Sequence, residues 1–416
     1  MGSVKALLVT LLALVLGVPQ EAPDDRLYGR VITAGGDVFE GYLRWDRNEG
    51  SWADVLDGSK ELPWDNLRDA EELDWEREEG RRERSVNILG LRISWTEDGN
   101  HYPSSALSGI RFGHIQRLRV RGDDRALLTL KSGEEVEFSG GSTDLGNSLR
   151  DLVVEDAQRG AVELRWRDLD EVEFLPAPPG AEPPAQRRLY GTLYTRSGME
   201  FTGFVSWDVD EILDSDVLDG EERGRDREIP FRRIASIQRA GSSGARVTLD
   251  NGDEITLRDS NDVDDGNRGI GISDPGLGYV TVDWDAFRRM EFHQPEDHGA
   301  GYADFSGGTY LWGTVVTEDD QRLTGYIRWD NDEEATWEFL NGQHQDVEFS
   351  VEFGRIEGIR RLGGWGAEVR LLDGRVFELE GSNDVDDTNK GIYVISEDGE
   401  VQLIPWRDFT EVFFAP

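Results

Sequence analysis

The chain has 416 residues, of which 37% are hydrophobic and 10% aromatic, which is enough apolar material for folded cores despite 31% charged residues. Its formal net charge of −40 disfavours binding to nucleic acid or to anionic lipid, because like charges repel. The sequence has no Cys, which excludes disulfides and Cys-ligated zinc, and its five His residues lack the HxxxH spacing of a helical zinc site.

The N-terminus carries one Lys and then an apolar run from Ala6 to Val18. The run is short for a membrane span and suits the core of a signal peptide. We therefore predict a signal peptide over residues 1–20, an exported protein in the periplasm or outside the cell, and no membrane span once the peptide is removed. A membrane anchor is the alternative for the same run.

Three later stretches resemble one another along their whole length. They are LYGRVITAGGDVFEGYLRWDRNE (27–49), LYGTLYTRSGMEFTGFVSWDVDE (189–211) and LWGTVVTEDDQRLTGYIRWDNDE (311–333). Each stretch ends in Trp-Asp-x-x-Glu, and a second half follows it with strand, Gly turn, strand, acidic loop and strand. Such self-similarity is the sequence signature of a repeat architecture. We predict three tandem repeats over residues 26–175, 188–293 and 309–416.

The local pattern within each repeat is typical of β-structure. Apolar and polar residues alternate, and hairpin turns are expected at Ser197-Gly198, Asn251-Gly252 and Asp373-Gly374. Turn signals recur roughly every ten residues, as in sandwiches and barrels. The sequence therefore predicts an all-β fold, in which each repeat is made of two small barrel-like or sandwich-like modules.

The first repeat contains an insertion of about residues 70–105. The highly charged stretch Asp69–Arg84 within it is expected to be a solvated helix or a loop. Two linkers separate the repeats: a Pro-rich one over residues 176–187 and a Gly-containing one over residues 294–308.

The opening pattern of each repeat resembles the first strands of Sm-like, SH3-type small barrels. In those proteins a turn Gly precedes a long bent strand that ends at an Asp, and Gly36, Gly41 and Asp46 fit this scheme. The Asn that such proteins use against RNA bases after the Asp is absent, and Glu49 stands nearby instead. The resemblance therefore implies barrel geometry and does not extend to RNA binding.

Two acidic loops, DSNDVDDGNRGI (259–270) and GSNDVDDTNKGI (381–392), are candidates for a Ca²⁺ site, because Ca²⁺ prefers six to eight oxygen ligands. The candidate ligands are Asn261, Asp262, Asp264, Asp265, Asn383, Asp384, Asp386 and Asp387. The alternative is that these side chains hold turns by accepting backbone hydrogen bonds. Arg268 and Lys390 follow the two clusters and would partly neutralise them, which favours the alternative. The first repeat keeps only Asp144 and Asn147 at matching positions.

The Trp-Asp-x-x-Glu turns offer paired carboxylates, such as Asp46 and Glu49, which glycoside hydrolysis requires. A catalytic pair should occur once, in a cleft, whereas this pair occurs three times in equivalent turns. Repetition therefore favours a structural role, and no catalytic or cofactor-binding residue is predicted.

Trp residues at matched positions are expected to lie in the cores. Six Trp residues have no counterpart in the other repeats and are the candidates for a binding surface: Trp52, Trp75, Trp95, Trp312, Trp337 and Trp365. These patterns together predict a non-enzymatic binding or scaffolding protein, with Ca²⁺ as a candidate stabiliser and a protein or a cell-envelope glycan as the partner. The alternative is a carbohydrate-binding protein or a glycan-active enzyme of the cell envelope.

Overall fold

The computed structural model describes residues 25–73, 82–88, 91–97, 105–140, 142–182, 184–295 and 300–415, with the backbone alone over 70–73, 82–88 and 91–97. The predicted all-β class is confirmed: the described residues form 32 β-strands and one α-helix. The strands lie in two large antiparallel sheets and one separate hairpin. The predicted signal peptide lies outside the described residues. None of the described helical residues forms a helix that is long and apolar enough to cross a membrane.

We refer to residues 26–175, 188–293 and 309–416 as segments 1, 2 and 3. Segment 1 contains β1 (Tyr28–Thr33), β2 (Val38–Arg44), β3 (Val55–Glu61), β6 (Ser105–Arg111), β7 (Ile115–Val120), β8 (Arg125–Leu130), β9 (Glu135–Ser139), β10 (Leu152–Asp156), β11 (Gly160–Leu164) and β12 (Leu169–Phe174). Its insertion adds α1 (Trp64–Leu73), β4 (Arg82–Ile88) and β5 (Leu91–Glu97).

Segments 2 and 3 contain ten strands each. Those of segment 2 are β13 (Tyr190–Thr195), β14 (Glu200–Ser206), β15 (Val217–Glu221), β16 (Asp226–Pro230), β17 (Ile234–Arg239), β18 (Gly244–Leu249), β19 (Glu254–Arg258), β20 (Ile270–Asp274), β21 (Gly278–Val282) and β22 (Phe287–Phe292). Those of segment 3 are β23 (Trp312–Thr317), β24 (Arg322–Trp329), β25 (Phe339–His344), β26 (Val347–Glu352), β27 (Ile356–Arg361), β28 (Gly366–Leu371), β29 (Val376–Glu380), β30 (Ile392–Ile395), β31 (Val401–Ile404) and β32 (Phe409–Phe414).

The strands of the three segments pair in the same spatial order. In segment 1 the order is β11-β10-β2-β1-β12-β7-β8-β9-β3-β6. In segment 2 the pairings give β21-β20-β14-β13-β22-β17-β18-β19-β15-β16. In segment 3 they give β31-β30-β24-β23-β32-β27-β28-β29-β25-β26. Each order begins and ends on a different strand, so the described strands close no barrel, and the barrel geometry implied by the resemblance is not observed.

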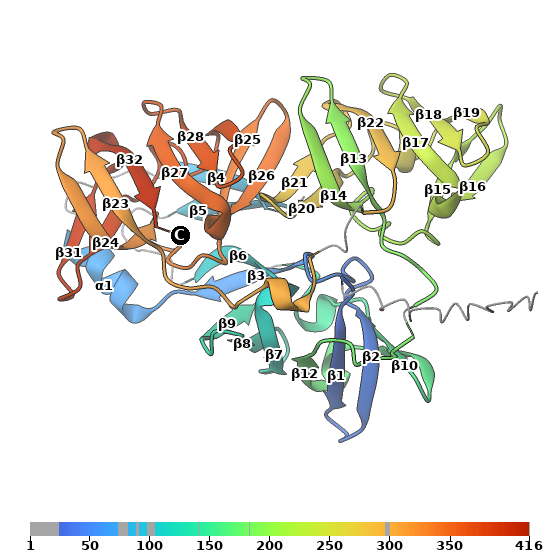
Figure 1. Ribbon diagram of the computed structural model, residues 1–416, viewed down its shortest axis with the longest axis horizontal. Helices are drawn as coiled ribbons and strands as arrows, with labels where there is room; N and C mark the ends of the chain where they lie inside the picture. Colours follow the sequence, from blue (N-terminus) through green and yellow to red (C-terminus); the bar gives the residue numbers. More distant parts are fainter. Residues whose placement is uncertain are drawn as a thin grey trace, which may run out of the picture.

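Segments 2 and 3 share one continuous sheet because β21 pairs antiparallel with β26, from Gly278↔Val351 to Val282↔Val347. Segment 1 forms the other large sheet. In Figure 1, segment 1 (blue to teal) lies against both segment 2 (green to yellow) and segment 3 (orange to red).

The β-structure follows from alternating burial along the strands. In β8, for example, Ala126, Leu128 and Leu130 are buried, and the residues between them are not. The predicted hairpin turns are present: Gly198, Gly252 and Gly374 adopt φ of 96°, 87° and 89°, a region that favours Gly. The matched Trp residues are buried as predicted, and Trp45, Trp207 and Trp329 are 0% exposed.

The prediction for the charged stretch Asp69–Arg84 is wrong in its boundaries. The helix begins at Trp64, directly after Pro63, whose carbonyl accepts the N–H groups of Asn66 and Leu67. The chain is a strand again from Arg82. The helix is also not simply solvated, since the buried Asn66 contacts Arg328 and Leu67 packs against Tyr393 of segment 3.

Candidate functional site

The Trp-Asp-x-x-Glu motif forms a tight turn at the end of β2, β14 and β24. In each turn the backbone N–H of the Trp donates to the backbone carbonyl of the Glu. The N···O distance is 2.8 Å from Trp45 to Glu49 and 2.9 Å from Trp207 to Glu211. The Asp and the residue after it have left-handed φ, for example 48° at Asp208 and 66° at Val209. Non-Gly residues in this region are strained, and such strain persists only where surrounding contacts hold it. We refer to residues 45–49, 207–211 and 329–333 as the Trp-Asp turns.

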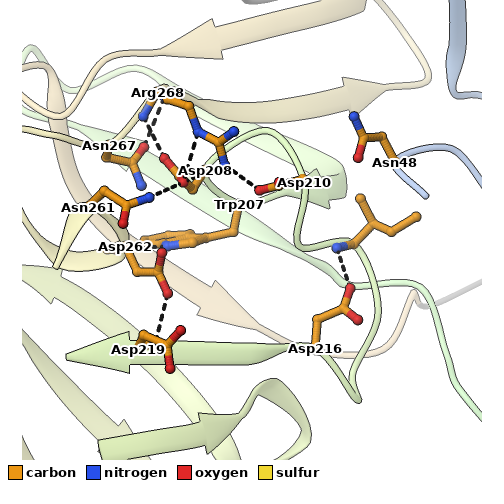
Figure 2. Close-up of polar contacts among 12 residues, drawn as sticks. Asn48, Trp207, Asp208, Asp210, Asp216, Asp219, Asn261, Asp262, Asn267 and Arg268 are labelled. Atoms are coloured by element: carbon orange, nitrogen blue, oxygen red, sulfur yellow. Dashed lines mark hydrogen bonds and ion pairs between the residues drawn. The ribbon is translucent and has the colours of Figure 1, made fainter. Parts of the chain in front are cut away.

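The acidic loop of segment 2 supplies the contacts that hold its Trp-Asp turn. Asp208 accepts the backbone N–H of Arg268 at 2.6 Å and the Arg268 guanidinium at 2.7 Å. The side-chain amide of Asn261 donates to the same carboxylate. Figure 2 shows Asn261 and Arg268 converging on Asp208, which is 0% exposed. The loop therefore acts as a set of hydrogen-bond donors to a buried carboxylate.

Asp262 connects the same loop to the strand below it. Its carboxylate accepts the N–H of Asp219 at 2.7 Å, and its carbonyl accepts the indole N–H of Trp207 at 2.9 Å. The two bonds recur at Asp144, which accepts from Asp57 and Trp45, and at Asp384, which accepts from Asn341 and Trp329. Asp144, which the first loop keeps, thus bonds both the strand and the turn.

Six of the eight predicted Ca²⁺ ligands hydrogen-bond to different partners through their side chains, and Asp265 and Asp387 are exposed. Asp264 accepts the N–H of Gly266, and Asp386 accepts that of Thr388. Asn383 donates to Asp330 as Asn261 does to Asp208. Ca²⁺ binding at these residues stays a prediction, and the hydrogen bonds favour the alternative in which they hold turns.

Among the described residues, Asp208, Asp210 and Glu211 are the one acidic group with ligand atoms within 4.8 Å of one another. The Arg268 guanidinium pairs with both Asp208 and Asp210. One side-chain cation therefore already compensates part of the charge of these two carboxylates.

Burial raises the pKa of the Glu residues in the Trp-Asp turns and so favours their neutral form. Burial, and then the neighbouring carboxylates of Asp262 and Asp210, raise the pKa of Glu211 to about 9. Burial raises the pKa of Glu49 and Glu333 well above the ordinary value in the same way. One carboxyl oxygen of each of the three is shielded and has no hydrogen-bond partner.

A cavity of about 380 Å³ lies between the Trp-Asp turns of segments 1 and 2. Figure 2 shows Asn48 of segment 1 opposite Asp210 of segment 2. The cavity is lined by Asn48, Glu49, Asp54, Val55, Asp57, Thr143, Asp144, Arg150, Ser206, Val209, Asp210, Arg268 and Tyr279. Arg150 ties the two walls together, through Asp46 at 3.3 Å and Asp210 at 3.5 Å. The volume is in the range of small-molecule sites.

Besides Glu49, two other carboxyls that line the cavity have a raised pKa. Burial raises the pKa of Asp144 to about 7, against the opposing effect of the Asp57 N–H bond. Burial, and then the charge of Asp144, raise the pKa of Asp57 well above its ordinary value. One oxygen of Asp57 has no hydrogen-bond partner. Carboxyls with such shifts can donate hydrogen bonds or protons near neutral pH.

Reasoning from sequence missed the ion pairs that join the segments. An acidic residue nine positions after each turn Trp accepts backbone N–H groups of its own segment and pairs with a base of another segment. The pairs are Asp54–Arg188 at 2.7 Å, Asp216–Arg44 at 3.3 Å and Glu338–Lys60. The three acids all lie nine positions after the Trp of their turn, and this shared spacing could have identified them in the sequence.

The prediction that unmatched Trp residues mark a surface is wrong for Trp52 and Trp337, each 1% exposed. Trp337 lies between segments, packed against Phe138, and Trp52 packs against Tyr302. Trp312 is half-buried and Trp365 is 53% exposed. The side chains of Trp75 and Trp95 lie outside the described residues.

Comparisons with known proteins give no further guide to the site. No protein-family model, no curated protein and no solved structure matches the chain. The roles of its residues therefore rest on their contacts.

Proposed function

We propose that this protein is an exported, non-enzymatic binding and scaffolding protein built from three copies of one ten-strand unit. The observation that carries the proposal is the recurrence of the same carboxylate contacts at the three Trp-Asp turns. Asp46, Asp208 and Asp330 each accept the backbone N–H of the basic residue that ends the acidic loop. Carboxylates committed to backbone donors in three equivalent places support a role in shape rather than in catalysis.

The contacts between segments support a rigid scaffold. Arg188 and Asp54 are both buried, and Glu352 of segment 3 lies 3.3 Å from Arg111 and 3.2 Å from His114 of segment 1. Burial alone would raise the pKa of Glu352, but Arg111 and His114 hold it at about 2. Charges buried across an interface are costly to separate, since each would be left without its partner. Export is supported by the sequence of residues 1–20.

One observation favours the alternative, a carbohydrate-binding protein or a glycan-active enzyme. The cavity between segments 1 and 2 holds Asp57 and Asp144, whose raised pKa values suit a general acid. Their partners argue otherwise, because Asp144 accepts the N–H of Asp57 and the Trp45 indole N–H donates to its carbonyl.

Two measurements test the proposal. Calorimetric unfolding is expected to give one cooperative transition, because the three segments share buried ion pairs. Incubation with bacterial cell-wall polysaccharide is expected to release no reducing ends and to give no binding. Release or binding that Asp57→Asn abolishes, with the melting temperature unchanged, would establish the alternative. Separate transitions for the segments would contradict a rigid scaffold.

A further inference from the structure

A cross-strand aromatic pair occurs at the same register in all three segments. The pairs are Tyr28↔Tyr42, Tyr190↔Phe204 and Trp312↔Tyr326, each beside a Gly↔Gly pair. Their ring centroids lie 5.2, 5.4 and 4.8 Å apart, and all three are edge-to-face. The three pairs are therefore equivalent surfaces of equivalent strands.

Segments 1 and 2 cover their pairs by packing together. Tyr28, Tyr42 and Phe204 are 7%, 3% and 4% exposed and belong to one apolar cluster, with Tyr190 packed against it. The Arg188 guanidinium lies 5.6 Å from the centroid of the Phe204 ring. The aromatic pairs of segments 1 and 2 are thus covered by apolar contacts, and Phe204 also has a cation over its ring.

Segment 3 leaves its pair open and lacks the cation. Tyr326 is 45% exposed and the adjacent Tyr310 is 57% exposed. Tyr310 forms an isolated β-bridge with Ala335. At the equivalent bridges, segment 2 has Arg188 and segment 1 has Arg26. We refer to Tyr310, Trp312 and Tyr326 as the aromatic face; β23 and β24, which carry Trp312 and Tyr326, lie at the end of the molecule opposite to segment 2 (Figure 1).

The rim of the aromatic face is acidic. Burial, and then the carboxylates of Glu134 and Glu334, raise the pKa of the Tyr310 hydroxyl. Among the described residues no basic side chain lies over these three rings. Aromatic rings beside carboxylates are a recognition surface for guanidinium and ammonium groups.

The chain uses this chemistry at two of the contacts between its own segments. Lys60 of segment 1 lies 5.8 Å from the Trp337 ring centroid and pairs with Glu338 of segment 3. Arg328 lies 4.6 Å from the Tyr393 centroid and pairs with Asp69 at 3.0 Å. In each case a base is held between an aromatic ring and a carboxylate.

We propose that the aromatic face docks an Arg- or Lys-bearing segment of a partner protein, which supplies the cation that segment 3 lacks. The proposal rests on the scaffolding function and names the chemistry of its partner. The net charge of −40 would steer a basic partner toward the molecule, and the rings would fix where it binds.

The test uses a synthetic hexapeptide of alternating Gly and Arg, with a Gly–Gln hexapeptide as the uncharged control. Affinity is measured by isothermal titration calorimetry in 0.15 M NaCl for three forms of the full chain. These are wild type, the double variant Tyr310→Ser with Tyr326→Ser, and Trp365→Ser, which removes an exposed Trp elsewhere. None of the substitutions changes the charge, so nonspecific attraction is equal in all three.

We expect the Arg peptide to bind wild type and Trp365→Ser with equal affinity. Its affinity for the double variant should be lower by a factor of about ten or more. Equal affinity in all three forms, or no binding to wild type, would overturn the proposal. It would also be overturned by sedimentation velocity that shows a wild-type dimer lost in the double variant, because the occupant would then be a second copy. Binding of an oligosaccharide that the double variant loses would overturn it in favour of a glycan.

These outcomes are separable from those for the scaffolding function. A failed peptide assay leaves the single unfolding transition and the absence of glycan turnover untouched. Glycan turnover in the cavity would overturn the scaffolding function whatever the peptide does at the aromatic face. Circular dichroism of the double variant checks that it is folded.

Discussion

Glu211→Gln is expected to make the protein more resistant to alkaline conditions. The carboxyl of Glu211 has a pKa of about 9 in the folded chain, against 4.5 for an ordinary Glu, because burial and nearby carboxylates disfavour its charge. Its contribution to stability is therefore fully present below pH 4.5 and is lost as the pH rises through about 9. The loss for full ionisation is on the order of 5 kcal/mol. Gln resembles the neutral acid and cannot ionise.

Urea unfolding of the wild type and Glu211→Gln at pH 5, 7 and 9 measures this effect. The free energy of unfolding of the variant should exceed that of the wild type by an amount that grows with pH. Glu200→Gln, at the exposed start of β14, is the matched control and should follow the wild type at every pH. A difference between Glu211→Gln and the wild type that stays constant from pH 5 to pH 9 would refute a neutral Glu211.

Lys60→Met is expected to destabilise the protein by about 3–5 kcal/mol, because it leaves the buried carboxylate of Glu338 without a counter-ion. Lys60 and Glu338 are 6% and 1% exposed, and Lys60 also donates to the carbonyl of Asp332. The pair joins β3 of segment 1 to the start of β25 in segment 3. The loss of free energy of unfolding is measured by urea denaturation at pH 7.

The double variant Lys60→Met with Glu338→Gln provides the control for this prediction. Glu338 accepts the N–H groups of Glu334 and Ala335 at 2.6 and 2.7 Å, and a Gln oxygen can still accept them. The double variant should therefore be more stable than Lys60→Met alone. A cost below about 1 kcal/mol for Lys60→Met would place the pair among surface ion pairs and weaken the case for a rigid junction.

The β-class and the hairpins could be predicted from the sequence because both depend on local patterns. Alternating burial in β8 and the Asn251-Gly252 turn are readable from a few adjacent residues. The start of α1 at Trp64 was missed because its packing against Tyr393 depends on segment 3, more than 300 residues away. The open strand order was missed because pairings such as β3 with β9 join residues distant in sequence.

The candidate site could be predicted only in part, for a related reason. The recurrence of the Trp-Asp turns predicted a structural role for their carboxylates, and this role stays a prediction. The sequence did not show that the turn Asp residues are buried, or that Asp144 bonds the strand and the turn in segment 1. Composition could not show that Trp337 is buried between segments, since an unmatched Trp is equally compatible with a surface and with an interface. The cavity could not be predicted from the sequence, because the residues that line it come from two segments.

We propose that hydrogen bonds from the acidic loop to Asp208, and from Asp219 to Asp262, hold the turn and strand of segment 2 without a bound ion. The most direct test is the free energy of unfolding of Asp262→Ala in EDTA and in millimolar Ca²⁺, compared with wild type and with the exposed Asp265→Ala. We expect Asp262→Ala to lose about 1–3 kcal/mol in both buffers, because the N–H of Asp219 loses its acceptor. Wild type and Asp265→Ala should be equally stable in both. A rise of several kcal/mol in the free energy of unfolding on adding Ca²⁺ to wild type, abolished by Asp265→Ala, would show instead that a bound ion holds the loop.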